Sequence, residues 1–421
     1  MREFRLDYPE VGTGTVPLSP YYDEGYFQLE RERVFRGQWL FVGREEEMPE
    51  AGDYLVKDLK VMDSSVLVLR GDDGKLRAFH NSCLHRGNRL LTSGHGHADL
   101  GFACGFHGWT YDCQGRLAYV PDEICFYGLD RAKLGLSALA CDTWRGFVFV
   151  NSDPQPTLPL LEFIGHEMDA QVGDFPFGAL ELAATYSVEL KVNWKYAAEA
   201  FQEAYHVVAV HRDTVADKNT VRRWEAERRA ALRGEPMPEL PPDSEPEHFF
   251  SSVRLWQRHR SMSTNGKRKL DVKMPPAMEL FYRLAPSPAH HVMTGLNPQK
   301  DPSWGADLQF LFPNTEILMA APTWYVTLSF WPLAADQTSI QVGFYRQPPR
   351  SAGELLAMEY IEANFRDVIR EDIAALEPAQ AMFRSKAVDA LWLSDQEIPA
   401  RHSFEIVASY VRGDDIARIT T

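Results

Sequence analysis

The sequence lacks several features that would assign it to a common class of protein. It has only five cysteines, an odd number, and no run of residues approaches the ~20 apolar positions of a membrane span. The N-terminus has no long apolar core for export. There is no strand–GxGxxG–helix signature and no plant-type ferredoxin set of cysteines. A disulfide-built secreted domain, a membrane protein and a chain that binds a nicotinamide by itself are therefore not expected.

The sequence also has fewer positively than negatively charged residues. The 44 Lys and Arg are outnumbered by 59 Asp and Glu, which gives a formal net charge of −15 and a pI near 5.4. Such a balance disfavours nucleic acid or an anionic membrane as a partner and allows docking of a soluble protein with a basic patch. The few cysteines are expected to be packed free thiols rather than disulfides, which is typical of a reducing compartment. We therefore expect a cytoplasmic protein.

The length and the apolar content predict two packed domains. A chain of 421 residues exceeds the size at which a single core stops growing, and 45% hydrophobic residues argue against disorder. Residues 1–37 read as a loop and a helix over 22–35. Residues 38–155 read as short β segments, with a hairpin signal where 66–70 and 75–79 flank turn glycines.

The remainder, 156–421, mixes both types of element. We expect a strand over 181–192, a helix over 194–206, antiparallel strands within 310–345 and a long amphipathic helix over 352–377. Between them, 215–300 is rich in charge and proline. It is predicted to be a solvated surface segment, with a lid over a substrate channel as the alternative.

Two short clusters of potential metal ligands dominate the first half. Cys83-Leu84-His85 is followed, after eighteen residues, by Cys104-Gly105-Phe106-His107. Two thiolates and two imidazoles could bind one structural zinc, so the number of ligands does not choose the metal. Glycines and aromatics flank both pairs, and such loops let the backbone approach an inorganic cluster and donate N–H bonds to its sulfides. C-x-H is also a poor zinc-ribbon spacing.

These motifs resemble the Rieske iron–sulfur domain. The resemblance implies a [2Fe–2S] cluster in which Cys83 and Cys104 bind one iron and His85 and His107 bind the other.

A second motif, Asn193-Trp194-Lys195 followed by Tyr205-His206 and then His211, lies in the second half. On an ideal helix His211 would lie about 140° around from His206, so the two could not bind one metal. They could converge if the helix breaks, and the valines at 207, 208 and 210 are poor helix formers. Spacing alone favours two unrelated histidines.

With the Rieske motif ahead of it, this stretch resembles the catalytic domain of Rieske non-haem iron oxygenases, large subunit. The family implies an α+β fold: an all-β Rieske domain, then an antiparallel sheet covered by helices (helix-grip, START-like). It also implies mononuclear Fe²⁺ on His206, His211 and a distant Asp. Asp372 falls on the apolar stripe of the 352–377 helix, where a buried carboxylate needs a metal, an ion pair or its own proton. We therefore predict Asp372 as the third ligand, with a salt-bridged Asp as the alternative.

Two positions differ from most of the family. Glu203 stands where most relatives have an Asp that bridges the iron-bound His to a Rieske His of the neighbouring subunit; Glu is typical of a subset that includes oxygenases of quaternary amines. The bridge is the favoured role, and an exposed helix carboxylate is the alternative. Ala200 replaces the Asn that many relatives have after the residue matched by Glu199.

The resemblance implies a terminal oxygenase that uses O₂ and electrons relayed from NAD(P)H by a separate reductase, with or without a ferredoxin. If Glu203 bridges subunits, the assembly is a ring, expected to be a homotrimer with or without β subunits. The expected substrate is an aromatic or bulky apolar small molecule, with a quaternary amine as the alternative. The predicted pocket residues are Ala200, Phe201, Gln202, Phe310 and Trp324.

A different class, a non-catalytic Rieske electron carrier, stays open. A carrier would need the Rieske domain alone, whereas more than half of this chain lies outside it. The second metal site is therefore the feature that discriminates the two.

Overall fold

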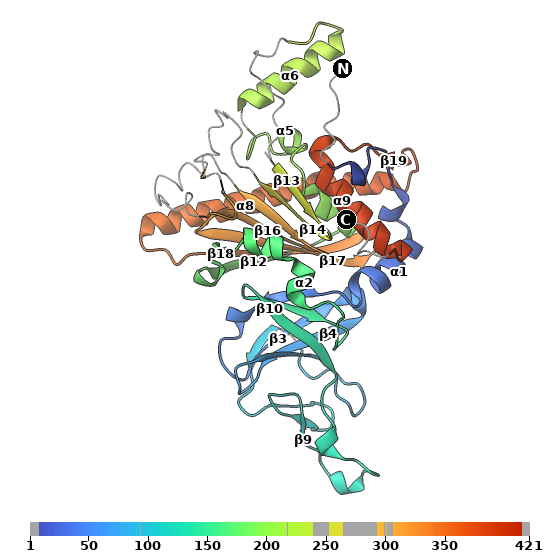
Figure 1. Cartoon of the computed structure of the whole chain (residues 1–421), viewed down its shortest axis with the longest axis vertical. Helices are drawn as coiled ribbons and strands as arrows, with labels where there is room; N and C mark the ends of the chain where they lie inside the picture. Colours follow the sequence, from blue (N-terminus) through green and yellow to red (C-terminus); the bar gives the residue numbers. More distant parts are fainter. Residues whose placement is uncertain are drawn as a thin grey trace. The chain divides into compact units, whose positions relative to one another are not determined.

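The computed structural model describes residues 8–92, 94–216, 218–238, 252–263, 293–298, 300 and 306–414. The chain divides into two compact units (Figure 1): residues 28–166, and residues 8–27 together with 167–414. The domain limits predicted from the sequence, at 37 and 155, stay predictions. No helix in the described ranges combines the length and the apolar character needed to cross a membrane.

The smaller unit is built almost entirely of strands. Its seven-stranded sheet has the order β2-β11-β10-β5-β4-β3-β6, and β7, β8 and β9 form a second, three-stranded sheet. The elements are β2 (Leu40–Arg44), β3 (Asp53–Leu59), β4 (Ser64–Arg70), β5 (Leu76–His80), β6 (Gly94–His97), β7 (Phe102–Ala103), β8 (Thr110–Tyr111), β9 (Leu117–Tyr119), β10 (Ala138–Trp144), β11 (Phe147–Asn151) and the short helix α2 (Leu160–Ile164). The predicted hairpin is confirmed as β4–β5, because Val66 pairs with His80 and Arg70 with Leu76.

One apolar core of this unit surrounds the three-stranded sheet. It contains Leu67 and Phe79 of the large sheet, Tyr111 of the small one, and the two predicted ligand cysteines, Cys83 and Cys104. The thiols are therefore held by a packed interior.

The larger unit contains a seven-stranded antiparallel sheet with the order β12-β18-β17-β16-β15-β14-β13. Its strands are β12 (Glu181–Leu190), β13 (Ser252–Trp256), β14 (His259–Ser263), β15 (Asp307–Leu311), β16 (Thr315–Ala321), β17 (Trp324–Ala334) and β18 (Gln337–Arg346). Its helices are α3 (His166–Gln171), α4 (Trp194–Ala200), α5 (Val207–Val210), α6 (Lys218–Arg233), α8 (Ala352–Phe383) and α9 (Ile398–Arg412), and the two-residue strands β1 (Val16–Pro17) and β19 (Ala390–Leu391) pair. The α+β prediction with a helix-covered antiparallel sheet is confirmed.

The segment 215–300 differs from its prediction. It contributes α6 and two strands of the sheet, β13 and β14, so it is not a surface excursion throughout. Because β14 contains mostly polar and charged residues, the hydrophobicity pattern of the sequence did not predict this strand. The stretches 239–251 and 264–292, on which the lid hypothesis depends, lie outside the described residues.

Helix α8 crosses one face of this sheet (Figure 1) and is six residues longer than predicted. Ser351 caps it, because its side chain accepts a hydrogen bond from the Glu354 N–H. Ile361 and Leu376 pack against sheet residues such as Leu328. The stripe that the sequence indicated therefore faces the sheet.

The N-terminal helix is shorter than predicted. Helix α1 (Glu24–Glu30) is followed by a wider turn over Arg31–Phe35. The preceding segment belongs to the larger unit, where Tyr21 packs against Phe383 of α8 and Phe404 of α9.

Candidate metal centres

Two matching turns carry the cysteine–histidine pairs. In each, the glycine four residues after the cysteine donates its N–H to the cysteine carbonyl over 2.9 Å, Gly87 to Cys83 and Gly108 to Cys104. Both glycines have a φ of +71°, a left-handed conformation that costs a residue with a Cβ free energy. The same backbone fold therefore presents both cysteines.

Each thiol has a polar neighbour. The Sγ of Cys83 lies 3.3 Å from the hydroxyl of Tyr111, which accepts the N–H of Leu84 at 3.0 Å. The Tyr111 O–H is therefore free to donate to the sulfur. Nδ2 of Asn88 lies 3.5 Å from Sγ of Cys104. Donors aimed at sulfur are the usual surroundings of iron–sulfur clusters.

Backbone amides also favour the thiolate of Cys104. Burial acts to raise the pKa of this thiol, but hydrogen bonds from the N–H groups of Phe106 and His107 outweigh it, and the pKa falls below its ordinary value. A thiolate is the form that binds metal.

The two histidines of these turns lie side by side, with ring centroids 4.6 Å apart. His85 is half-buried and stacks on Trp109 at 5.0 Å, and its Nδ1 is buried without a hydrogen-bond partner among the described residues. Burial, together with the charges of His107 and Arg86, lowers the pKa of His85. A neutral imidazole with an unpartnered, buried nitrogen fits a metal ligand.

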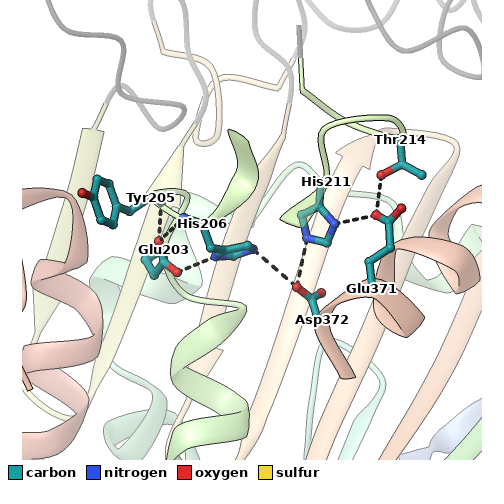
Figure 2. Close-up of polar contacts among 7 residues, drawn as sticks. All are labelled: Glu203, Tyr205, His206, His211, Thr214, Glu371 and Asp372. Atoms are coloured by element: carbon teal, nitrogen blue, oxygen red, sulfur yellow. Dashed lines mark hydrogen bonds and ion pairs between the residues drawn. The ribbon is translucent and has the colours of Figure 1, made fainter. Parts of the chain in front are cut away.

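The second centre joins α5 to α8 (Figure 2). His206 precedes α5, His211 follows it, and Asp372 lies on the buried face of α8 with 4% of its surface exposed. Oδ1 of Asp372 is 2.9 Å from Nε2 of His211 and 3.4 Å from Nε2 of His206. One donor atom from each of the three residues lies within 4.8 Å of the others, which is close enough for one metal ion.

The predicted helix over 194–206 is wrong beyond residue 200. Helix α4 ends at Ala200, an irregular segment follows, and α5 is a separate helix of four residues. His211 leaves that helix with φ −104° and ψ +32°. The sequence placed the break at the valines of 207–210; these instead form α5, and the break lies before His206, between Ala200 and that helix.

Each histidine of this centre also binds a carboxylate through its other nitrogen. Nδ1 of His206 contacts Oε1 of Glu203, and Nδ1 of His211 lies 2.8 Å from Oε2 of Glu371. A carboxylate can only accept, so each Nδ1 carries the proton, and Nε2 is the nitrogen through which each histidine would bind a metal. Thr214 donates to the same Glu371 oxygen at 2.6 Å.

Glu371 and Thr214 were not predicted as site residues. Glu371 adjoins Asp372 in the sequence, and this adjacency was the available signal. Nothing in the sequence indicated Thr214, because its contact depends on the turn after α5.

The charges around the three ligands favour a cation. Burial acts to lower the pKa of His211, but the hydrogen bonds and charges of Asp372 and Glu371 outweigh it and raise this pKa. Two imidazoles and one carboxylate are the donor set of the facial triad that holds non-haem Fe(II). The residues therefore fit a mononuclear iron.

The Cys83–His107 set is spaced differently. In the part of the chain that the structure describes, the His206 centre alone brings three potential ligand atoms within 4.8 Å of one another. Donors around a single zinc would be that close, whereas a cluster of two irons separates its ligands.

Comparison with known families agrees with both centres. Residues 38–130 match the Rieske [2Fe–2S] domain, and residues 177–413 match the family described as ring hydroxylating alpha subunit (catalytic domain). The chain belongs to the ring-hydroxylating oxygenase alpha-subunit family. The cofactors of this family are a Rieske cluster and a mononuclear iron.

Relatives of this ring-hydroxylating alpha subunit act on two kinds of substrate. This chain is 33% identical over 200 residues to the glycine betaine monooxygenase oxygenase subunit of Chromohalobacter salexigens. The alignment covers 48% of this chain and 44% of the relative. The chain is 35% identical over 218 residues to biphenyl dioxygenase subunit alpha of Paraburkholderia xenovorans, covering 47% and 46%. The chain thus aligns with about half the length of these curated relatives.

Solved structures show the same fold over nearly the whole length. Naphthalene 1,2-dioxygenase with indole bound superposes with a TM-score of 0.71 at 22% identity, covering 99% of this chain and 98% of that one. The quaternary ammonium Rieske monooxygenase CntA gives 0.70 at 20% identity, covering 94% and 95%. The fold does not choose between the two substrate classes.

The five predicted pocket residues of this oxygenase subunit fall into two groups. Ala200 and Phe201 are partly buried and pack against the apolar core between α8 and the sheet, to which Trp324 also belongs. Gln202 and Phe310 are buried beside a cluster of charged residues. Contact of these residues with a substrate stays a prediction.

Proposed function

We propose that this chain is the terminal oxygenase component that uses O₂ and electrons relayed from NAD(P)H to hydroxylate an aromatic or bulky apolar small molecule. The observation that carries the proposal is the convergence of His206, His211 and Asp372 in a chain that also has a Rieske domain. A non-catalytic carrier would have no use for this second centre.

The proposed roles of the side chains follow from their contacts. Fe(II) held by the triad would supply O₂ activation. His206, His211 and Asp372 hold the metal on one side. Glu203 and Glu371 fix the ring orientation of the two histidines and keep the proton on Nδ1.

Cys83, His85, Cys104 and His107 are proposed to hold the [2Fe–2S] cluster. Such a cluster supplies electrons one at a time, at a potential raised by its histidine ligands. The electrons come from a separate reductase, with or without a ferredoxin. All five cysteines of the chain are free, which fits the reducing cytoplasm that we propose as its location.

We further propose that Glu203 bridges His206 to a Rieske histidine of a neighbouring subunit. Its carboxylate binds His206 and keeps 11% of the side-chain surface exposed. This arrangement supports a homo-oligomeric ring, in our proposal a trimer with or without β subunits. The variant Glu203→Gln is expected to keep both metals and to slow reduction of the mononuclear iron; wild-type single-turnover rates would contradict the bridge.

Apolar side chains near the triad favour an apolar substrate. Phe365 and Ile373 stand on α8 within two turns of Asp372, and Phe201 precedes His206; all three pack as partly buried residues against the same core. The alternative, monooxygenation or demethylation of a quaternary amine, is favoured by the Glu at position 203.

The substrate class can be tested by product analysis. The subunit, with a reductase system and ¹⁸O₂, is incubated with aromatic hydrocarbons, aromatic acids and quaternary amines. One or two labelled oxygens in an aromatic product support the first proposal. A labelled aldehyde and a demethylated or cleaved amine support the second. Absence of label from every product, with both metals loaded, contradicts an oxygenase.

A further inference from the structure

A fully buried charged pair lies between two strands of the larger sheet. Arg260 in β14 and Glu316 in β16 flank Phe310 in β15, with which both are in register. The arginine has 1% and the glutamate 0% of its surface exposed. The guanidinium lies 4.4 Å from the Phe310 ring centroid, and its Nη2 is 3.5 Å from Oε1 of Glu316.

This pair is incompletely satisfied. Nε of Arg260 and Oε2 of Glu316 have no hydrogen-bond partner among the described residues. Burial lowers the pKa of Arg260 to about 9 and raises that of Glu316 to about 7, against the opposing effect of each partner. Apolar residues of similar volume in place of such a pair often leave stability unchanged or raise it. Stability is therefore a poor reason for this pair.

The pair is connected to the end of α4 through α9. Nη1 of Arg260 donates to Oγ of Ser403 at 3.3 Å, and the Ser403 O–H donates to Oε1 of Gln202 at 3.1 Å. A hydroxyl has a single proton, so the order from arginine to serine to amide is fixed. Gln202 has 0% of its surface exposed, and its amide orientation is set by this contact.

Gln202 adjoins the residue that orients an iron ligand. The segment between α4 and α5 has no regular structure, and the N–H groups of Tyr205 and His206 both donate to Oε2 of Glu203. Glu203 thus faces His206, while the neighbouring Gln202 faces the buried cluster. Figure 2 shows the ring of Tyr205 directed away from the metal centre, so it does not anchor the segment there.

We propose that Arg260, Glu316, Ser403 and Gln202 form a positioning cluster that fixes the 202–206 segment, and through Glu203 the ring of His206. The proposal rests on the proposed function, because it assumes that His206 binds the mononuclear iron. None of the four residues needs to touch the substrate. Their role is to keep an irregular stretch of backbone in one conformation.

The decisive variant is the double substitution Arg260→Met with Glu316→Leu, which removes both charges at similar volume. The melting temperature should be unchanged or higher. In the iron-free protein, amide exchange at Tyr205 and His206 should become faster. The Kd for Fe(II) should rise about 10-fold, the low end of the loss seen for residues behind a metal ligand.

A matched pair of single variants separates positioning from packing. Gln202→Leu should repeat the faster exchange and the weaker Fe(II) binding. Gln309→Leu removes an amide that is equally buried at 0% exposure, but in β15 next to Phe310 and hence directed to the opposite face of the sheet. It should leave both readouts at the native values.

The proposal is overturned if the double variant keeps native amide exchange and native Fe(II) affinity. It is also overturned if Gln202→Leu and Gln309→Leu change both quantities equally, since the effect would then follow packing alone. Neither readout needs a substrate or turnover. A wrong assignment of the reaction would therefore leave this test intact, whereas failure of the native protein to bind Fe(II) would contradict the proposed function itself.

Discussion

The two metal centres of this chain are built in opposite ways. The four proposed Rieske ligands come from two neighbouring turns with the same backbone fold, all within residues 83–107. The three proposed ligands of the mononuclear centre come from both ends of a short helix and from α8, and Asp372 is separated from His206 by 166 positions. The first centre is local, and the second depends on the tertiary fold.

The hydrogen-bond partners of the ligand side chains also differ between the two centres. Thiols of the first centre receive hydrogen bonds from backbone N–H groups and from Tyr111. The histidines of the second are held by carboxylates, Glu203 and Glu371. Donors that stabilise negative charge suit a store of electrons, and acceptors that hold neutral imidazoles suit an open metal site.

The largest expected effect comes from His206→Ala. Loss of one of three ligands should abolish Fe(II) binding at this centre, and with it all oxygenation, while the visible spectrum of the Rieske cluster is unchanged. Metal analysis and product analysis of the same preparation measure both. Normal turnover would show that the triad is assigned wrongly.

The reverse experiment is Cys104→Ser. The [2Fe–2S] chromophore should be lost, because serine does not replace a buried thiolate that is stabilised by backbone N–H groups. Fe(II) binding at the His206 centre should persist, since the larger unit has its own core. Loss of both metals together would show that the two centres are not independent.

A smaller effect is expected from Glu371→Gln. The amide could donate to Nδ1 of His211, or leave it unpaired, so the Kd for Fe(II) should rise about 10- to 100-fold. The matched control is Glu377→Gln on the same helix, whose carboxylate accepts the backbone N–H of Lys191 at 3.0 Å. Equal effects of both variants would refute a special role for Glu371.

The smallest effect concerns pH and the smaller unit. Hydrogen bonds to Glu47 and Asp53 raise the pKa values of His95 and His97, both on the edge strand β6. A raised pKa in the folded state contributes stability at pH values below about 6.5, and this contribution is lost as pH rises through the raised value.

Replacement of both histidines by glutamine should therefore lower the melting temperature of this unit at pH 6 and have little effect at pH 9. Bleaching of the cluster absorbance on heating reports the transition. The near neighbours Lys57 and Asp99 are unchanged in this variant. A difference that grows with pH would contradict the assigned ion pairs.

The residues of the Rieske centre could be predicted from the sequence, whereas those of the mononuclear centre could be predicted only in part. The C-x-H and C-x-x-H spacings are contiguous, and turn glycines mark them. Asp372 could be proposed because its position on the apolar stripe of α8 is a periodic signal. Glu371 and the strand β14 could not be found this way, because their roles depend on partners distant in sequence.

The buried pair of Arg260 and Glu316 shows the same limit. The periodicity of a strand does not predict that a charged residue lies inside, because tertiary contacts decide where its partner stands. The break after Ala200 was expected further along the chain, at the valines of 207–210, which instead form α5.

The position of Asp372 on α8 has a consequence for the lifetime of the protein. A metal ion held jointly by His206 and Asp372 acts as a reversible cross-link that closes a loop containing most of the larger sheet. Closing a long loop restricts the unfolded chain, and a ligand that binds only the folded state stabilises it by mass action. Loss of iron would then make the polypeptide more susceptible to proteases as well as inactive.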